Sequence, residues 1–435
     1  MKIQLIHPPT DESYTGWIYE WFKPPPIGLE LIASKVESKV QDCSIQILDG
    51  NFVSLDEIVE KIDADYVGVS DWYSCHHNVL EILRQAKTRD AITVTGGPNA
   101  SHLAERILQN NDFVDYVVVG DGEDAFSMLV AGEDPSKIPN LVYRRGNTIV
   151  RNKRQNIELG TIFDLEHLDL SFYDRKIPIP ISSIRGCVKA DQSKRCSFCS
   201  IDTKLRLMSP RKVWQQIDLL YNRYGFAYFF ETGDSFIAGN YPEKLLRVRP
   251  DDFNLRTVRF RIYASPEQIT RDTIIPLIVL NVKSIFVGVE TVNENILQRA
   301  GKRHSKTDVE NALKLLNNAS IQVQIAIIYG LPGETPETLE ETYQFTKDAS
   351  QKYPKTTLCV SPAIPIVGTE LFHNLLANKD VKERYKGDLT GDYFDYKQLT
   401  RLQTEHFTSV TFEDVRDYIA KTKLLVQEKS PSFGF

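Results

Sequence analysis

The chain has 435 residues, of which 42% are hydrophobic and 25% charged, and its formal net charge is −6 at pH 7. This composition is typical of a globular protein with two domains, and no block of like charge indicates a nucleic-acid-binding arm or a polybasic membrane anchor. No apolar run approaches the roughly 18 residues of a membrane span, so we expect a cytoplasmic protein with small-molecule partners, and neither nucleic acid nor a membrane among them.

Residues 1–141 predict the first α/β domain. Glycines stand after two of its expected strands, at Gly96-Gly97-Pro98 and at Gly120-Asp121-Gly122. Strands that alternate with amphipathic stretches form an open, mostly parallel, Rossmann-like sheet, which binds ligands at its carboxyl edge. The expected strands are 3–6, 45–48, 66–69, 92–95 and 116–119.

A second alternation follows an irregular segment. Residues 142–180 read as a linker with a hairpin at 144–147, and residues 373–435 as a covering segment with a helix near 412–426. Between them, 181–372 predicts a partial (β/α)6 barrel, whose functional residues lie at the carboxyl ends of the strands. The expected barrel strands are 181–185, 227–231, 259–264, 284–289, 323–329 and 357–361.

Three of the six cysteines are clustered after the first expected barrel strand. Cys187, Cys196 and Cys199 have the spacing C-x8-C-x2-C. Clustered thiols in a cysteine-poor chain fit metal binding in a reducing compartment better than a disulfide framework. Three thiolates on a cubic [4Fe–4S] cluster leave one iron free to chelate a small molecule. A zinc site is the alternative, but it requires a fourth ligand, and no histidine lies within the motif.

These cysteines and the strand ends that follow resemble the radical S-adenosylmethionine (SAM) superfamily. Its members commonly space the cluster cysteines C-x3-C-x2-C and place an aromatic residue before the last, as Phe198 is here. Later segments resemble the family's strand-end motifs in order: Tyr228–Phe236, Arg261–Ser265, Val287–Thr291, Tyr329–Thr335 and Pro362–Phe372.

The resemblance implies roles for individual residues. Cys187, Cys196 and Cys199 would be the catalytic cluster ligands, and Thr232, Gly233 and Asp234 would receive the ammonium group of SAM. Arg261 would pair with the SAM carboxylate. Further SAM contacts would be Phe198, Glu231, Tyr263, Glu290 and Gly330. Taken singly, the acidic residues are explained equally well as helix caps or ion-pair partners, and Arg261 as a structural arginine.

The first domain resembles the cobalamin-binding module that is often fused ahead of a radical SAM barrel. Pro24–Glu30, Gly96–His102 and Gly120–Phe126 are close to the motifs of that module. The cobalt-ligating Asp-x-His-x-x-Gly motif is absent, because Asp49-Gly-Asn-Phe stands in its place. The resemblance therefore allows cobalamin without a histidine from that motif.

The loop after the third strand would meet the lower face of a corrin. Trp72 and Tyr73 would pack on it, His76 would approach it, and Gly97 would let the backbone come close. The alternative is an aromatic loop that covers a domain interface.

The resemblance predicts an enzyme that reductively cleaves SAM at a [4Fe–4S] cluster to modify a small molecule, with methyl transfer as the leading chemistry. An external electron donor of flavodoxin or ferredoxin type would supply the reducing equivalent. If the wide cysteine spacing re-aims the open iron, the alternative is 3-amino-3-carboxypropyl transfer to an arsenic substrate, as in arsinothricin biosynthesis. A non-enzymatic cobalamin- or metal-binding regulator is the third possibility.

Overall fold

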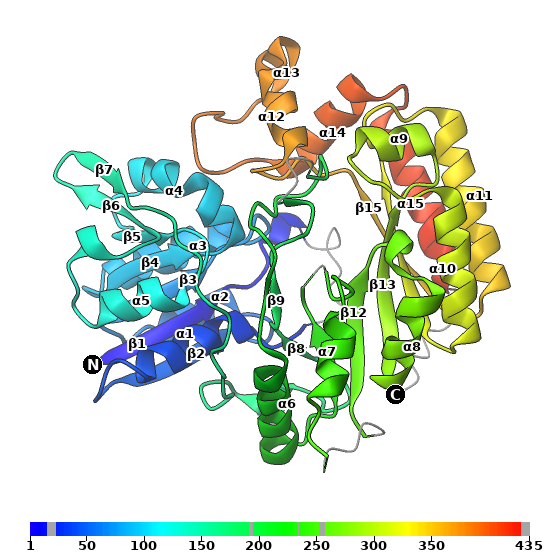
Figure 1. Ribbon diagram of the computed structural model, residues 1–435. Helices are drawn as coiled ribbons and strands as arrows, with labels where there is room; N and C mark the ends of the chain where they lie inside the picture. The colour runs from blue at the N-terminus through cyan, green and yellow to red at the C-terminus, as the bar shows by residue number, and fades with distance from the viewer. Residues whose placement is uncertain (15–22, 191–194, 234, 252–256, 428–435) are drawn as a thin grey trace. The chain divides into compact units, whose positions relative to one another are not determined.

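The computed structural model describes residues 1–14, 23–190, 195–233, 235–251 and 257–427. The chain divides into two compact units (Figure 1). Unit 1 comprises 1–174 and 387–394, and unit 2 comprises 175–386 and 395–435. The mixed α/β fold class is confirmed. One expected boundary differs, because 387–394 belongs to unit 1 and not to a single covering segment that runs from 373 to 435.

Unit 1 contains a seven-stranded sheet in the order β2-β1-β3-β4-β5-β6-β7. Strands β1 to β5 run parallel, whereas β6 and β7 are antiparallel. The expected hairpin at 144–147 joins β6 to β7, but both strands extend this sheet, so 142–151 is not linker. The bounds are β1 Lys2–His7, β2 Ser44–Asp49, β3 Tyr66–Ser70, β4 Ile92–Gly96, β5 Tyr116–Val118, β6 Leu141–Arg145 and β7 Thr148–Arg151.

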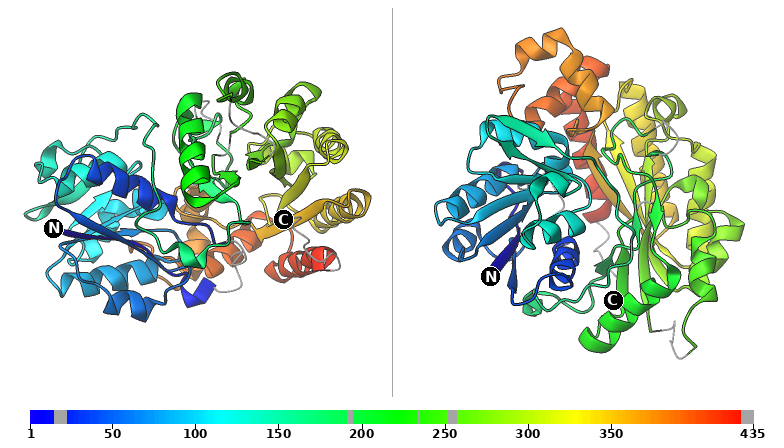
Figure 2. Two further views of the ribbon diagram at one scale, coloured as in Figure 1. Left: turned by 90° about the horizontal axis from the view of Figure 1, so that it is seen from below. Right: turned by 60° about the vertical axis from the view of Figure 1, so that its left-hand side comes forward.

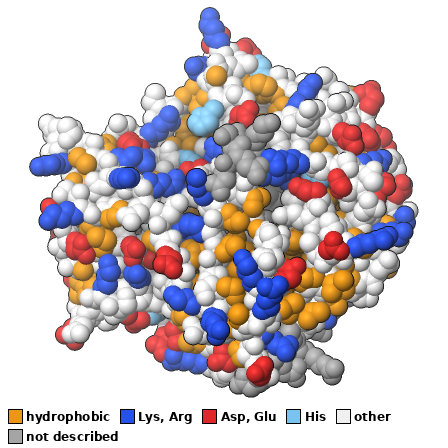
Figure 3. All heavy atoms as spheres, in the orientation of Figure 1, with side chains coloured by type: hydrophobic (Ala, Val, Ile, Leu, Met, Phe, Trp, Pro, Cys, Tyr) orange, Lys and Arg blue, Asp and Glu red, His pale blue; other side chains and the backbone are white. Residues whose placement is uncertain are grey.

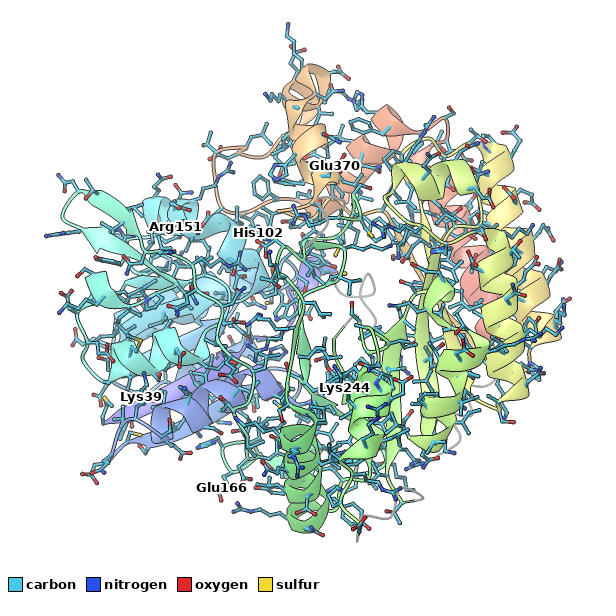
Figure 4. The ribbon with its side chains drawn as sticks, in the orientation of Figure 1. Lys39, His102, Arg151, Glu166, Lys244 and Glu370 are labelled. Atoms are coloured by element: carbon cyan, nitrogen blue, oxygen red, sulfur yellow. The ribbon has the colours of Figure 1, made fainter. Side chains whose placement is uncertain are left out.

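Helices cover both faces of this sheet, as Figure 2 shows. Buried apolar residues of the strands, such as Ile6, Val67 and Val94, account for this cover. Arg151 of β7, labelled in Figure 4, forms an ion pair with Glu105 on the helix α4. The helices are α1 Ile27–Glu37, α2 Leu55–Glu60, α3 His76–Lys87, α4 Pro98–Asn110 and α5 Glu123–Val130.

Unit 2 contains a six-stranded, entirely parallel sheet in the order β15-β14-β13-β12-β11-β8. The first strand differs from the expected 181–185, because the strand that pairs with β11 is Ile179–Ile181. Residues 184–185 turn away as β9 and pair antiparallel with β10, Arg206–Leu207. The other bounds are β11 Tyr228–Glu231, β12 Arg259–Ala264, β13 Val282–Glu290, β14 Gln322–Tyr329 and β15 Thr356–Pro362.

Helices α10, α11 and α15 cover the outer face of the last strands of this sheet (Figure 1). Ile275, Ile278 and Val279 of α8 have exposed side chains. Figure 3 shows hydrophobic side chains gathered on this view of the surface. Within the described residues, no helix is both long and apolar enough to cross a membrane. The helices are α6 Pro210–Tyr224, α7 Tyr241–Arg247, α8 Arg271–Val279, α9 Glu294–Arg299, α10 Lys306–Asn318, α11 Pro336–Lys352, α12 Glu370–Ala377, α13 Lys379–Arg384, α14 Tyr396–Phe407 and α15 Phe412–Gln427.

Candidate functional site

The segment that carries the clustered cysteines begins directly after β9. The amide of Cys187 donates to the carbonyl oxygen of Thr203 at 3.2 Å, and Cys187 forms an isolated bridge with Lys204. The amide of Lys189 approaches Sγ of Cys187 at 3.5 Å. The backbone on both sides of the first cysteine is therefore fixed next to the strand pair β9–β10.

The other two cysteines lie in a tight turn. The amide of Cys199 donates to the carbonyl oxygen of Cys196 at 3.0 Å. Ser197 links this turn to two further segments, since its amide donates to Ala300 at 3.1 Å and its carbonyl oxygen accepts from Leu371 at 3.0 Å. The C-x2-C turn is thus held between the ends of α9 and α12.

Gly301 packs directly under this turn. Its φ is +74°, and a Cβ there would lie 2.7 Å from the carbonyl oxygen of Arg195 and 3.4 Å from Cα of Cys196. A side chain at this position would meet both a strained backbone conformation and a backbone contact. Position 301 therefore requires glycine for the turn to keep its place.

The side chains of Phe198, in the turn, and Lys302, after α9, lie close to each other. The Phe198 ring packs against the buried side chains of Ile296, Leu331 and Leu371, and Nζ of Lys302 lies 5.6 Å from its centroid. The same Nζ is 2.7 Å from Oε1 of Glu290, and both side chains are less than a tenth exposed. Burial lowers the pKa of Lys302, but the Glu290 carboxylate more than offsets this and raises it above its ordinary value.

The donor chemistry of this segment suits an iron–sulfur cluster. Cys187, Cys196 and Cys199 form no disulfide bond. The cysteines of a cubic cluster each bind a different iron, so three thiols can hold such a cluster, whereas a zinc site would need a fourth ligand.

The expected SAM-ammonium motif follows β11 and packs against β9. The amide and the hydroxyl of Thr232 both donate to the carbonyl oxygen of Ile181 at 3.1 Å. A Cβ on Gly233 would lie 2.3 Å from Cβ of Ile184, so only glycine fits there. Asp234, the third member of the motif, lies outside the described residues.

The Glu231 carboxylate accepts hydrogen bonds from nearby residues of the protein. Its Oε1 accepts from the amide of Gly233 at 3.0 Å, and its Oε2 accepts from the amide of Ser183 at 3.2 Å and from the Ser183 hydroxyl. The side chain is fully buried, and this burial raises the pKa of Glu231 to about 7 although the hydrogen bonds oppose the shift. Glu231 thus ties the turn after β11 to the segment before Cys187.

Arg261 and Tyr263 lie on the inner face of the barrel. The Arg261 guanidinium donates to Oγ of Ser284 at 3.4 Å and to Oε1 of Gln324. The Tyr263 ring packs between two aromatic rings, with its centroid 5.2 Å from that of Phe230 and 5.1 Å from that of Phe286. These two candidates face the interior enclosed by β11 to β14.

The remaining barrel candidates have partners of their own. Glu290 pairs with Lys302, as described above, and has a left-handed φ of 64° at the end of β13. The carbonyl oxygen of Gly330 accepts from Nε2 of Gln403 on α14 at 3.0 Å, and its amide donates to Glu334. Gly330 therefore anchors α14 within unit 2.

In unit 1, the candidates after β3 differ in exposure. Trp72 is 47% exposed, so its ring is available to pack against a ligand. The Tyr73 ring packs edge-on against Tyr14, with 5.9 Å between centroids, and burial raises the pKa of Tyr73 to about 12. Gly97 lies under the same loop, where a Cβ would be 2.7 Å from the carbonyl oxygen of Asp71.

His76 is only 2% exposed. Its Nδ1 lies 3.0 Å from Oδ2 of Asp71, and its Nε2 lies 3.8 Å from Oδ2 of Asp392, in the segment 387–394. Burial lowers the pKa of His76, but the two carboxylates outweigh it and raise the pKa to about 10. His76 is therefore held by Asp71 through Nδ1, while its buried Nε2 has no hydrogen-bond partner. Trp72 is the exposed candidate of this loop.

Several residues that shape these sites are not among the residues predicted from the sequence. Lys302, Asp392, Ser284 and Gln324 were all missed. Gln324 did carry a usable signal, because it is a polar residue with period-2 spacing in an otherwise apolar strand. Asp392 carried no local signal, since its partners lie far away along the chain.

Two family models match the chain. The Radical SAM superfamily matches residues 181–346, and the B12 binding domain matches residues 22–130. The chain thus contains a radical SAM domain and a B12-binding domain. A radical SAM domain uses a [4Fe–4S] cluster and SAM, and a B12-binding domain is consistent with cobalamin as a further cofactor.

Two relatives match most or all of the chain. It is 25% identical over 466 residues to an uncharacterized methyltransferase, PH0819, of Pyrococcus horikoshii, with 100% of this chain and 96% of the relative covered. It is 23% identical to the anaerobic magnesium-protoporphyrin IX monomethyl ester cyclase of Cereibacter sphaeroides, with 92% of this chain and 68% of that protein covered.

A solved structure shares the fold. The radical SAM methyltransferase TsrM from Kitasatospora setae, solved with cobalamin and a [4Fe–4S] cluster bound, superimposes with a TM-score of 0.66 at 19% identity. The match covers 85% of this chain and 74% of TsrM. At this level of identity, the likeness concerns the fold.

Proposed function

We propose that this protein transfers a methyl group from SAM to a small molecule with the help of cobalamin. The observation that carries the proposal is the presence of a B12-binding domain and a radical SAM domain in one chain. The printed names of PH0819 and TsrM, both methyltransferases, support it. The cyclase of Cereibacter sphaeroides has a similar sequence, so the assay below must identify the product and not only detect turnover.

The residues of this chain bind the cofactors and orient them. Cys187, Cys196 and Cys199 hold the cluster, and the turn at 232–233 presents backbone groups to the amino end of SAM. The cluster supplies a single electron to SAM when it is reduced by an external donor. A flavodoxin or a ferredoxin is our proposal for that donor.

We expect this site to act mainly by holding its cofactor-binding segments in place, and less through groups that gain or lose a proton. The turn at 232–233 and the segment before Cys187 share the Glu231 carboxylate, so the two binding elements keep a constant separation. Hydrogen bonds from Ala300 and Leu371 hold the C-x2-C turn in the same way. Such preorganisation reduces the entropy lost when a cofactor binds.

The first experiment tests the cluster ligands. Anaerobic reconstitution with iron and sulfide should give about four irons per chain and a broad iron–sulfur absorbance. Cys187→Ala, Cys196→Ala and Cys199→Ala should each lower the iron content, whereas Cys43→Ala, in a half-buried position of unit 1, should not. Full loading of any one of the three variants would refute the assignment.

The second experiment identifies the chemistry. Reconstituted protein with dithionite, SAM, cobalamin and candidate substrates should form S-adenosylhomocysteine together with 5′-deoxyadenosine if a methyl group is transferred. Formation of 5′-methylthioadenosine would instead support 3-amino-3-carboxypropyl transfer, as in the arsinothricin-type alternative. 5′-Deoxyadenosine without S-adenosylhomocysteine would support hydrogen abstraction alone and contradict methylation.

Cobalamin binding is tested by spectroscopy, without turnover. We expect hydroxocobalamin to remain with the protein after gel filtration and Trp72→Ala to reduce the amount retained. Because His76 is enclosed, His76→Gln should leave the visible spectrum of the bound corrin unchanged. A shift of that spectrum in the His76 variant would show that this imidazole is a cobalt ligand.

A further inference from the structure

The two faces of the barrel sheet have different chemistry. Outward-facing residues such as Phe260, Ile285 and Ile325 are buried and apolar, as helix-covered strands require. The neighbouring inward-facing positions are polar or aromatic, although branched apolar residues normally fill a barrel interior. They include Tyr228, Phe230, Arg261, Tyr263, Ser284, Phe286 and Gln324.

Arg261 is the charged group at the centre of this interior. It is 8% exposed, and its hydrogen-bond partners, Ser284 and Gln324, are both neutral. Its Nε has no hydrogen-bond partner, and no carboxylate in the described ranges forms an ion pair with it. Burial accordingly lowers the pKa of Arg261 from its ordinary value.

A buried cation without a counter-ion is costly, because desolvation is not repaid by a nearby negative charge. The Phe230 ring, 5.4 Å from the guanidinium carbon, offsets only part of this cost. The unsatisfied Nε and the absent carboxylate both indicate that a ligand supplies the missing anion. A carboxylate suits a guanidinium best, because two parallel hydrogen bonds can form between the planar groups.

We propose that Arg261 recognises a carboxylate of the substrate inside the barrel. This inference rests on the proposed function and names the substrate class: a carboxylic acid with a flat, apolar body. The aromatic rings of Phe230, Tyr263 and Phe286 lie in one connected row beside Arg261 and provide the apolar surface for that body. Ser284 and Gln324 hold the guanidinium in place.

SAM also carries a carboxylate, but the position of Arg261 along its strand favours the substrate carboxylate as its partner. Arg261 lies three residues before the end of β12 at Ala264, or about 10 Å along the strand. The cluster segment and the turn at 232–233 follow the carboxyl ends of their strands, and SAM is expected there. A second anion, deeper in the barrel, therefore belongs to a different molecule.

The test uses the reconstituted full-length holoenzyme and two probes of the same shape, 4-fluorobenzoate and neutral 4-fluorobenzamide, observed by fluorine NMR. Wild-type protein should bind the benzoate more tightly than the benzamide. Arg261→Gln should weaken benzoate binding about tenfold or more and leave benzamide unaffected, because only the charged pair is lost. Arg259→Gln, on the same strand and face, is the matched control and should change neither affinity.

A further variant guards against misfolding. Arg261→Lys keeps the positive charge but not the planar pair of donors, so its benzoate affinity should lie between those of wild-type protein and Arg261→Gln. Benzoate affinity as low as that of Arg261→Gln, with unchanged circular dichroism, would contradict recognition by charge. Equal wild-type affinity for the two probes would also overturn the inference. SAM binding is measured separately by equilibrium dialysis. If Arg261→Gln binds SAM more weakly but keeps its benzoate affinity, the carboxylate that pairs with Arg261 belongs to SAM, and the inference is wrong. Failure of the proposed function is separate, since it appears as absent SAM turnover in wild-type protein.

Discussion

Nδ1 of His76 lies 3.0 Å from Oδ2 of Asp71, and both side chains are buried in unit 1. Asn99 donates to the same carboxylate at 3.1 Å, so Asp71 is held from two sides. On the far side of the imidazole is Asp392, to which Asn111 also donates. One buried imidazole thus joins the loop after β3 to the segment 387–394.

This arrangement predicts a pH-dependent stability. The pKa of His76 rises from 6.5 to about 10 in the folded protein, so its contribution is complete below pH 6.5 and is lost as the pH rises through 10. His76→Gln should flatten the fall in the free energy of unfolding over this range, measured by urea denaturation. His77→Gln, at the adjacent exposed position, should keep the wild-type slope.

Asp392→Asn should loosen the segment 387–394 from unit 1. The variant leaves His76 with one carboxylate instead of two, at a cost of about 1 to 3 kcal/mol. Limited proteolysis should then cut within 387–394 faster than in wild-type protein. Asp388→Asn, on the exposed side of the same segment, serves as the control, and equal cleavage rates of the two variants would contradict the role of Asp392.

Gly301→Ala should impair cluster loading. The new Cβ would lie 2.7 Å from the carbonyl oxygen of Arg195, which pushes the C-x2-C turn out of place. Gly225 has a nearly identical φ of +75°, but a Cβ there meets nothing within 4 Å. Gly225→Ala should lose about 1 kcal/mol of stability, Gly301→Ala should lose more because of the backbone contact, and only Gly301→Ala should lose iron. Equal iron content in the two variants would refute this prediction.

Lys302→Met should destabilise unit 2 by about 3 to 5 kcal/mol, because the Glu290 carboxylate would remain buried without its partner. The double variant Lys302→Met with Glu290→Gln removes both charges and should recover part of this loss. Urea denaturation of the four proteins in this cycle measures the coupling. Additive losses in the double variant would show that the pair is not coupled.

Glu231→Gln should change how stability depends on pH. The folded-state pKa of Glu231, about 7, is above the ordinary 4.5, so the contribution of this side chain to stability is complete below pH 4.5 and is lost as the pH rises through 7. The glutamine variant cannot ionise and should show a smaller fall. The exposed Glu310→Gln should keep the wild-type slope, and an unchanged slope in Glu231→Gln would contradict the buried carboxylate.

Much of the architecture could be predicted from local patterns. Buried parallel strands are short apolar runs, so the expected 259–264 coincides with β12, and 323–329 differs from β14 by one residue. The expected first barrel strand differs from β8 because apolar residues occur on both sides of Ser182 and Ser183, and the pattern does not show where pairing with β11 ends. That end depends on Ser183, which binds the distant Glu231.

The candidate site was harder to predict for a similar reason. The sequence shows that Glu231, Glu290 and His76 are acidic or basic, but not which groups they face. Each has a partner from another part of the chain: Ser183, Lys302 and Asp71 or Asp392 respectively. Their roles as cofactor contacts, like those of the cluster cysteines, stay predictions until the variants are measured.

Because 387–394 belongs to unit 1, this unit is assembled from two segments that lie more than 200 residues apart in the chain. A ribosome must therefore translate unit 2 as far as residue 386 before Asp392 can reach His76. The nascent first sheet should wait in an incomplete, less protected state while the barrel emerges. An isolated fragment ending at residue 174 would remain in that state permanently, so expression trials of this unit should carry 387–394 as a fused or added peptide.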